Sequence, residues 1–122
     1  MDPSLLADED YCYLTTTGRV TGQPHTVEMW FALDGPTLYV LSGGGDRSDW
    51  VRNVQRNPEV TVRIGSTTFR GRGRVVEGAG EDELARRLLV EKYAPRTGGS
   101  LSNWRRTALP VAVDLDGTTG GG

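Results

Sequence analysis

The chain has 122 residues, the length of one compact domain, with 36% hydrophobic and 25% charged residues. A formal net charge of −2 gives no global case for a nucleic-acid partner, and no apolar run approaches the roughly 18 residues that span a bilayer. With one cysteine, Cys12, and no basic-then-apolar leader at its start, the chain is expected to be cytoplasmic, without integral membrane contact.

Strand patterns dominate the chain. Residues 26–33 alternate, with Val27, Met29 and Phe31 on one side, and the pair Gly65-Ser66 is a two-residue hairpin signal because glycine adopts a positive φ at no steric cost. Alternation and β-branched content predict six strands, at residues 11–16, 26–33, 37–41, 60–64, 67–76 and 109–115.

Two helices interrupt these strands. Residues 48–56 place Trp50, Val51 and Val54 on one side before Pro58, and residues 81–94 carry an apolar stripe. A third short helix is expected at 102–106, and a cap or short helix in the acidic opening at 2–10. The fold class is therefore mainly β with α (α+β), a small six-stranded antiparallel barrel, because closure removes exposed sheet edges. The barrel is expected to span residues 1–116, followed by a flexible Gly-rich tail at 117–122.

The first segment that is a candidate for chemistry is TTTGRVTGQPH, residues 15–25, between two predicted strands. Its glycines let the backbone approach a ligand closely, and Arg19 offers a forked cation suited to phosphate or carboxylate. Thr21 and Gln23 add neutral donors, and His25, the only histidine, is suited to proton transfer or anion contact. The alternative is a long polar hairpin loop with a solvated arginine and a structural histidine.

The second candidate segment is LSGGGDRSDW, residues 41–50, where a strand ends, three glycines follow and a helix begins. Backbone N–H groups at a helix start attract anions, and glycines let a phosphate sit close. The pattern is neither a Walker motif nor a dinucleotide fingerprint. The alternative is a flexible turn with ordinary capping by Asp46 or Ser48.

The remaining chemistry-bearing residues favour structural roles. Arg70, Arg72 and Arg74 alternate onto one sheet face, which is more often a solvated face than a coenzyme contact. Cys12 lies in a strand pattern and is expected to be a buried, unreactive thiol. One histidine and one cysteine leave no basis for a zinc site, and no metal is expected.

Three strings of the sequence together resemble a known family. TTTGRVTGQPH, LDGPTLYVLSGGG and DWVRNVQRNPEVTVRIG are similar to segments of the deazaflavin-dependent nitroreductase family, which belongs to the flavin-reductase-like split β-barrels. The resemblance covers roughly residues 11–115 and implies a split β-barrel that binds coenzyme F420, a deazaflavin with a phosphate and an acidic tail. Some members of the wider superfamily hold FMN instead, so FMN is the alternative cofactor.

The resemblance also assigns residues to the cofactor. It implies coenzyme contacts from the loop, from the serine and glycines after the third strand, and from the following helix. The residues so assigned are Arg19, Thr21, Gly22, Gln23, Pro24, His25, Ser42, Gly43, Gly44, Gly45, Arg47, Trp50 and Asn53. Ser42 is the one catalytic candidate, as a hydrogen-bond donor to charge developing on a substrate oxygen.

Two departures from the family pattern bear on activity. Gly43 stands where many members have a lysine, and Arg47 or Arg52 is the available substitute cation. Of the tyrosines near the C-terminal helix in the nitro-drug reducers, only Tyr93 remains, which speaks against prodrug-type nitroreduction.

The predicted activity is hydride transfer from F420H2 to a small organic acceptor, an enone, quinone or nitroaromatic. An FMN-binding reductase or oxidase, or a non-catalytic ligand binder, is the alternative. The expected partner is a small-molecule substrate, and both a monomer and a homodimer are open.

Overall fold

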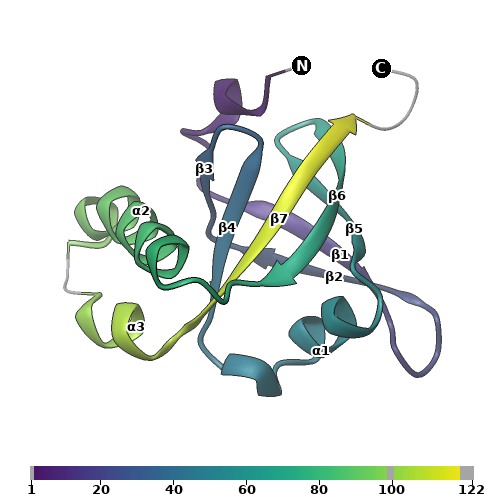
Figure 1. Cartoon of the computed structure of the whole chain (residues 1–122). Helices are drawn as coiled ribbons and strands as arrows, with labels where there is room; N and C mark the ends of the chain where they lie inside the picture. Colours follow the sequence, from purple (N-terminus) through teal and green to yellow (C-terminus); the bar gives the residue numbers. More distant parts are fainter. Residues whose placement is uncertain (1, 99–100, 119–122) are drawn as a thin grey trace.

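The structure is a computed structural model that describes residues 2–98 and 101–118. Three helices accompany a seven-stranded sheet (Figure 1). The strands are β1 (Cys12–Thr17), β2 (Pro24–Met29), β3 (Ala32–Asp34), β4 (Thr37–Ser42), β5 (Glu59–Ile64), β6 (Thr67–Val75) and β7 (Leu109–Thr118). The helices are α1 (Asp49–Arg56), α2 (Ala79–Thr97) and α3 (Ser102–Thr107), with short 3-10 turns η1 (Pro3–Leu6) and η2 (Gly45–Arg47).

The sheet is curled rather than flat. Its strand order is β2-β1-β5-β6-β7-β4-β3, and all neighbours pair antiparallel. The two edge strands, β2 and β3, are consecutive in the chain and are joined only through Trp30 and Phe31. Because two residues cannot bridge a flat seven-stranded sheet, its two edges must lie near each other. The antiparallel, barrel-like sheet expected from the sequence is thus present.

The strand count was wrong, because the predicted strand at 26–33 is two strands. The backbone of Phe31 is held by helix side chains instead of a neighbouring strand. Its N–H donates to Tyr93 Oη at 3.0 Å, and its carbonyl accepts from Lys92 Nζ at 3.0 Å. Before this point the chain, as β2, pairs with β1, and after it the chain, as β3, pairs with β4. The alternation of side chains at residues 26–33 therefore continues through the point where the neighbouring strand changes from β1 to β4.

The buried side chains form two clusters on opposite faces of the sheet. Inside the curl, Phe31, Phe69 and Val111 pack with Val51 and Val54 of α1. Outside it, α2 covers β3 and β4, as Figure 1 also shows. Residues 38–42 of β4 are therefore buried on both faces. Cys12 is fully buried as predicted, and burial raises the pKa of its thiol to about 12.

Most element ends lie within two residues of the predicted ones, and two ends, those of α2 and β7, lie three residues beyond them. The second helix continues to Thr97 instead of ending before Pro95, and it ends at Gly98 in the left-handed conformation (φ 70°). Proline removes only one helical N–H, and the Arg96–Asp10 ion pair anchors the last turn to the chain's opening. Strand β7 includes residues 117 and 118 of the predicted tail, and residues 119–122 lie outside the described residues.

Arg74 fastens the start of α2 to the sheet. Its guanidinium donates to Glu81 Oε1 at 2.6 Å and Oε2 at 2.8 Å, and to Asp114 Oδ2 at 2.8 Å. Tyr39 Oη donates to Glu81 Oε2 at 2.7 Å. These bonds from Arg74 and Tyr39 lower the pKa of the Glu81 carboxyl from 4.5 to about 2. Of the three arginines predicted to share one sheet face, Arg74 therefore has a structural role.

This network predicts a specific loss of stability in acid. A carboxyl whose pKa is lowered by folding stabilises the protein above about pH 5, and the contribution disappears as the pH falls toward 2. We expect Glu81→Gln to cost about 1–2 kcal/mol at pH 7, allowing for solvent screening, and almost nothing at pH 2. Urea unfolding at several pH values measures this. Glu77→Gln is the control, because Glu77 is exposed and has no hydrogen bond or ion pair among the described residues; equal pH profiles for both variants would contradict the assignment.

Candidate functional site

The loop between β1 and β2 is a folded unit with its own hydrogen bonds. Gly18 N–H donates to Gln23 O at 2.8 Å, Gly22 N–H to Gly18 O at 2.9 Å, and Gln23 N–H to Thr21 Oγ1 at 3.2 Å. Gly22 has a φ of 75°, the left-handed region that glycine adopts without strain. The loop is therefore closed on itself and presents Arg19 and Thr21 at a defined place.

A cavity of about 410 Å³ lies between this loop, β2 and the first turns of α1. Its volume falls within the roughly 300–1,000 Å³ typical of small-molecule sites. The lining residues are Gly18, Arg19, Val20, Thr21, His25, Thr26, Val27, Asp49, Trp50 and Asn53. Five residues predicted from the sequence, Arg19, Thr21, His25, Trp50 and Asn53, are thus brought together. Gly22, Gln23 and Pro24 belong to the same loop and the start of β2 but do not line the cavity.

The polar groups of this cavity are organised around Arg19. Its guanidinium donates to Asp49 Oδ1 at 3.1 Å and to Asn53 Oδ1 at 2.9 Å, and its backbone N–H donates to Asn53 Oδ1 at 3.1 Å. Asn53 is 3% exposed, and its Nδ2 donates to Thr16 Oγ1 at 3.2 Å. The cavity therefore combines a cation, hydroxyl and imidazole groups and the indole of Trp50, a set suited to an anionic aromatic ligand.

The second predicted segment is built differently. Ser42 is 2% exposed, and its hydroxyl contacts Gly45 O and Ser48 Oγ, each at 2.9 Å. A Cβ on Gly44 would lie 2.5 Å from Ser48 Oγ, so this glycine allows the turn to fold tightly. Gly43, Gly45 and Arg47 do not line the cavity, and α1 separates the turn from the β1–β2 loop in Figure 1. Their contact with a cofactor, like the catalytic role of Ser42, stays a prediction.

Asp49 is the one charged residue among the five lining residues that the sequence interpretation did not assign to the site; the others are Gly18, Val20, Thr26 and Val27. It is the first residue of α1 and precedes Trp50, which was singled out. The sequence pattern indicated Asp46 or Ser48 as the helix cap and gave Asp49 no role. Its pairing with Arg19, 30 positions earlier, depends on the way the loop folds over the helix.

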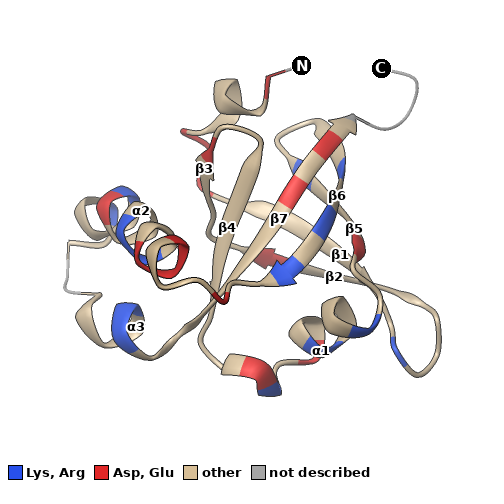
Figure 2. Ribbon diagram, in the orientation of Figure 1, with Lys and Arg blue, Asp and Glu red and all other residues tan. Residues whose placement is uncertain are grey.

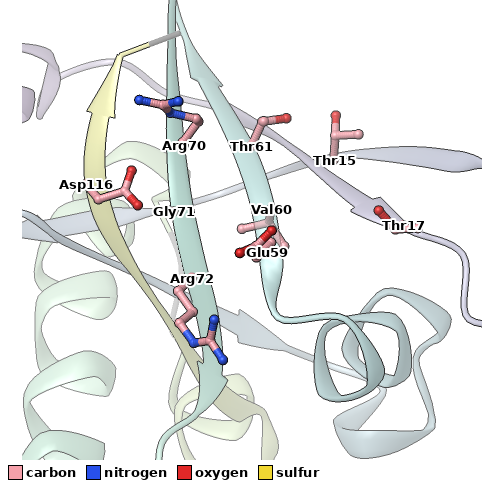
Figure 3. A pocket seen from close by; sticks show the side chains of 9 residues that line it. All are labelled: Thr15, Thr17, Glu59, Val60, Thr61, Arg70, Gly71, Arg72 and Asp116. Carbon is pink, nitrogen blue, oxygen red and sulfur yellow. The ribbon is translucent and has the colours of Figure 1, made fainter.

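A larger cavity, about 550 Å³, lies on the outer face of β1, β5, β6 and β7 (Figure 3). Arg70 and Arg72 face it, and neither has a hydrogen bond or ion pair within the described part of the chain. Glu59 and Asp116 share the same cavity, and Figure 2 shows the acidic positions of β7 beside the basic positions of β6. Because the charges are mixed, this surface has no net attraction for a polyanion.

The family model for F420H(2)-dependent quinone reductases matches residues 4–116, which is nearly the whole chain and includes every predicted site residue. The chain belongs to this family. The family thus agrees with the deazaflavin-dependent resemblance seen in the sequence.

Among residues 2–98 and 101–118, no helix is long and apolar enough to cross a membrane, and no group of three metal-ligating side chains is found.

Individual family relatives support the same grouping. An F420H(2)-dependent quinone reductase of Mycobacterium tuberculosis is 43% identical over 70 residues, covering 55% of this chain and 42% of that protein. The chain therefore spans less than half the length of the curated relatives it matches. The solved structure of an F420-H2 dependent reductase has a TM-score of 0.67 at 26% identity, covering 88% of this chain and 94% of its own. A second solved structure, described as an F420 reductase, has a TM-score of 0.65 at 25% identity and covers 96% and 94%.

Proposed function

We propose that the chain is an F420H2-dependent oxidoreductase that transfers hydride to a small organic acceptor, with quinones as the first class to test. Family membership supports the cofactor class. The observation that carries the site is the cavity in which the β1–β2 loop places Arg19 opposite the first turns of α1. Enones and nitroaromatics are the other acceptors within the proposal.

The residues around the cavity fit the coenzyme's chemistry. In the proposal, Arg19, Thr21 and His25 bind its phosphate and tail, and Trp50 packs against its ring system. Bound F420H2 supplies the hydride, which none of these side chains can provide. In the proposal, the chain's own residues hold the coenzyme in a fixed position next to the acceptor. Such positioning lowers the barrier to reaction.

The neighbouring turn has a secondary place in the proposal. Gly43 and Gly45 have open space where a side chain would be, which leaves room for a long anionic ligand to approach the backbone as it passes the start of α1. Arg47 is exposed beside them and supplies a cation where Gly43 replaces the family lysine. For Ser42 to donate to a substrate, its hydroxyl must leave Gly45 O, so we assign it first to the shape of the turn.

Tyr93 and Trp30 have little part in this proposal. The Tyr93 hydroxyl is bonded to the backbone of Phe31, and its ring stacks on Trp30 at 4.3 Å. The Tyr93 hydroxyl is therefore already bonded within the fold and is not placed to contact a substrate in the cavity. Trp30 packs against the rings of Tyr93 and Trp104 within its own chain.

Titration with F420 and FMN side by side tests the cofactor. We expect F420 to bind more tightly than FMN. We also expect bound F420H2 to be oxidised to F420 when a quinone is added. Arg19→Ala is expected to weaken F420 binding about tenfold, as loss of a charge-assisted hydrogen bond does. Absorbance and fluorescence of the two cofactors report binding.

Arg87→Ala is the matched control, because Arg87 lies on α2 and, among the described residues, pairs only with Glu91 one turn away. It should leave F420 binding unchanged. Tight FMN binding without F420 binding would favour a flavin reductase or oxidase. Binding of F420 without turnover on any acceptor class would favour a non-catalytic binder.

A further inference from the structure

Arg19, the cation of the proposed site, is already occupied by protein acceptors. Nη2 donates to Asp49 Oδ1 at 3.1 Å, while Nη1 donates to Asn53 Oδ1 at 2.9 Å and to Asp49 O at 3.4 Å. An arriving anion must share or displace these partners. The two side chains that hold Arg19 differ sharply in exposure, which assigns them different roles.

Asn53 is the fixed partner. Its Oδ1 accepts both the backbone N–H and the guanidinium of Arg19, and its Nδ2 donates to the hydroxyl of Thr16. Asn53 and Thr16 are 3% and 1% exposed. Breaking these bonds leaves buried polar groups unpaired, which is costly, so the amide stays in place when a ligand arrives.

Asp49 is the replaceable partner. Its side chain is 85% exposed, against 29% for Arg19, and its one ion pair within the described part of the chain is the one with Arg19. Exposed pairs of this kind contribute little to stability. Its carboxylate nevertheless occupies Nη2, and its negative charge repels an anionic group that approaches this nitrogen.

We propose that Asp49 is an internal competitor of the coenzyme's anionic group for Arg19, while Asn53 is a positioning residue that keeps Arg19 at the cavity. The proposal rests on the proposed function for the identity of the coenzyme. The contacts with Arg19 do not depend on it. Asp49 sets a limit on anion affinity, so removing its charge strengthens binding, which is the reverse of the usual result of mutating a cavity residue.

Asp49→Asn tests the competition. F420 should bind about three- to fivefold more tightly to this variant at low salt, and the gain should shrink as salt screens the charges. The deazaflavin chromophore without phosphate and tail should bind both proteins equally. In an Arg19→Ala background, Asp49→Asn should give a clearly smaller gain, because only the direct repulsion of the anion is then lost. Unchanged or weaker F420 binding to Asp49→Asn, or the same gain without Arg19, would overturn the proposal.

Binding of inorganic phosphate tests the competition at Arg19 without relying on F420, so it distinguishes a failure of this inference from a failure of the proposed function. Its binding is followed by the nuclear magnetic resonance shift of the Arg19 backbone amide, and Asp49→Asn should again bind more tightly. If the native protein bound no F420, the proposed function would fail. The phosphate comparison would still decide whether Asp49 competes for Arg19.

The role of Asn53 is tested by tryptic cleavage after Arg19. Asn53→Ala should speed cleavage about tenfold and weaken F420 binding, because the loop loses its attachment to α1. Asn53→Asp keeps the acceptor oxygen, and the Thr16 hydroxyl can rotate to donate to it, so this variant should restore slow cleavage. Equal cleavage of native protein and Asn53→Ala would refute the positioning role, as would failure of Asn53→Asp to restore protection.

Discussion

A Tyr93→Phe variant is expected to have a free energy of unfolding about 1–3 kcal/mol lower than that of the native protein. The Tyr93 hydroxyl accepts the Phe31 N–H at 3.0 Å and lies 2.8 Å from Asp10 O and 3.0 Å from Phe31 O, which compete for its proton. Tyr93 is 1% exposed, so no water replaces the lost hydroxyl. The buried N–H of Phe31 is then left without a partner at the point where the chain passes from β2 to β3.

Urea unfolding measures this loss, and Tyr13→Phe is its control. The Tyr13 hydroxyl donates to Glu28 Oε2 at 2.8 Å on the exposed face of β1 and β2, where water can replace it. The control should therefore lower the unfolding free energy far less than Tyr93→Phe does. Equal losses in the two variants would show that the Tyr93 hydroxyl does not hold the strand junction.

The same junction shows where sequence reasoning about the fold stopped. The pattern at 26–33 correctly predicted extended backbone, because alternation reports only that side chains point to opposite faces. It carries no information on which strand lies alongside. The change of partner at Trp30 and Phe31 depends on Lys92 and Tyr93, which lie more than 60 positions away on α2. The seventh strand therefore arises from a tertiary contact that periodicity does not encode.

The candidate site shows a similar division. Glycines, an arginine and a nearby tryptophan marked the loop and the helix as donor-rich, and the structure places Arg19 and Trp50 at one cavity. Residue types did not reveal that Arg19 would be paired with Asp49, because that pair joins a loop to a helix far along the chain. Local composition also could not show that the hydroxyl of Ser42 bonds within its own turn.

Gly73→Val is expected to destabilise the protein by about 3 kcal/mol, the upper part of the range for overpacked cores. A Cβ at Gly73 would lie 2.7 Å from Val54 Cγ1, closer than real Cβ contacts, and valine adds two methyl groups beyond it. Val54 is 1% exposed and belongs to the inner cluster, so a shift of its side chain disturbs the packing of its neighbours. Either β6 or α1 must shift to accept the new side chain.

This shift also reaches the proposed site, because α1 carries Asp49, Trp50 and Asn53 on the turns next to Val54. Gly73→Val should therefore weaken F420 binding as well as lower the unfolding free energy, both measured on the same preparation. Gly43→Val is the matched control for stability: its Cβ would meet no atom within 4 Å, and its φ is not positive. If both variants unfolded at the same denaturant concentration, the close approach of α1 to β6 would not be what fixes the helix, and the placement of Asn53 against Arg19 would need another support.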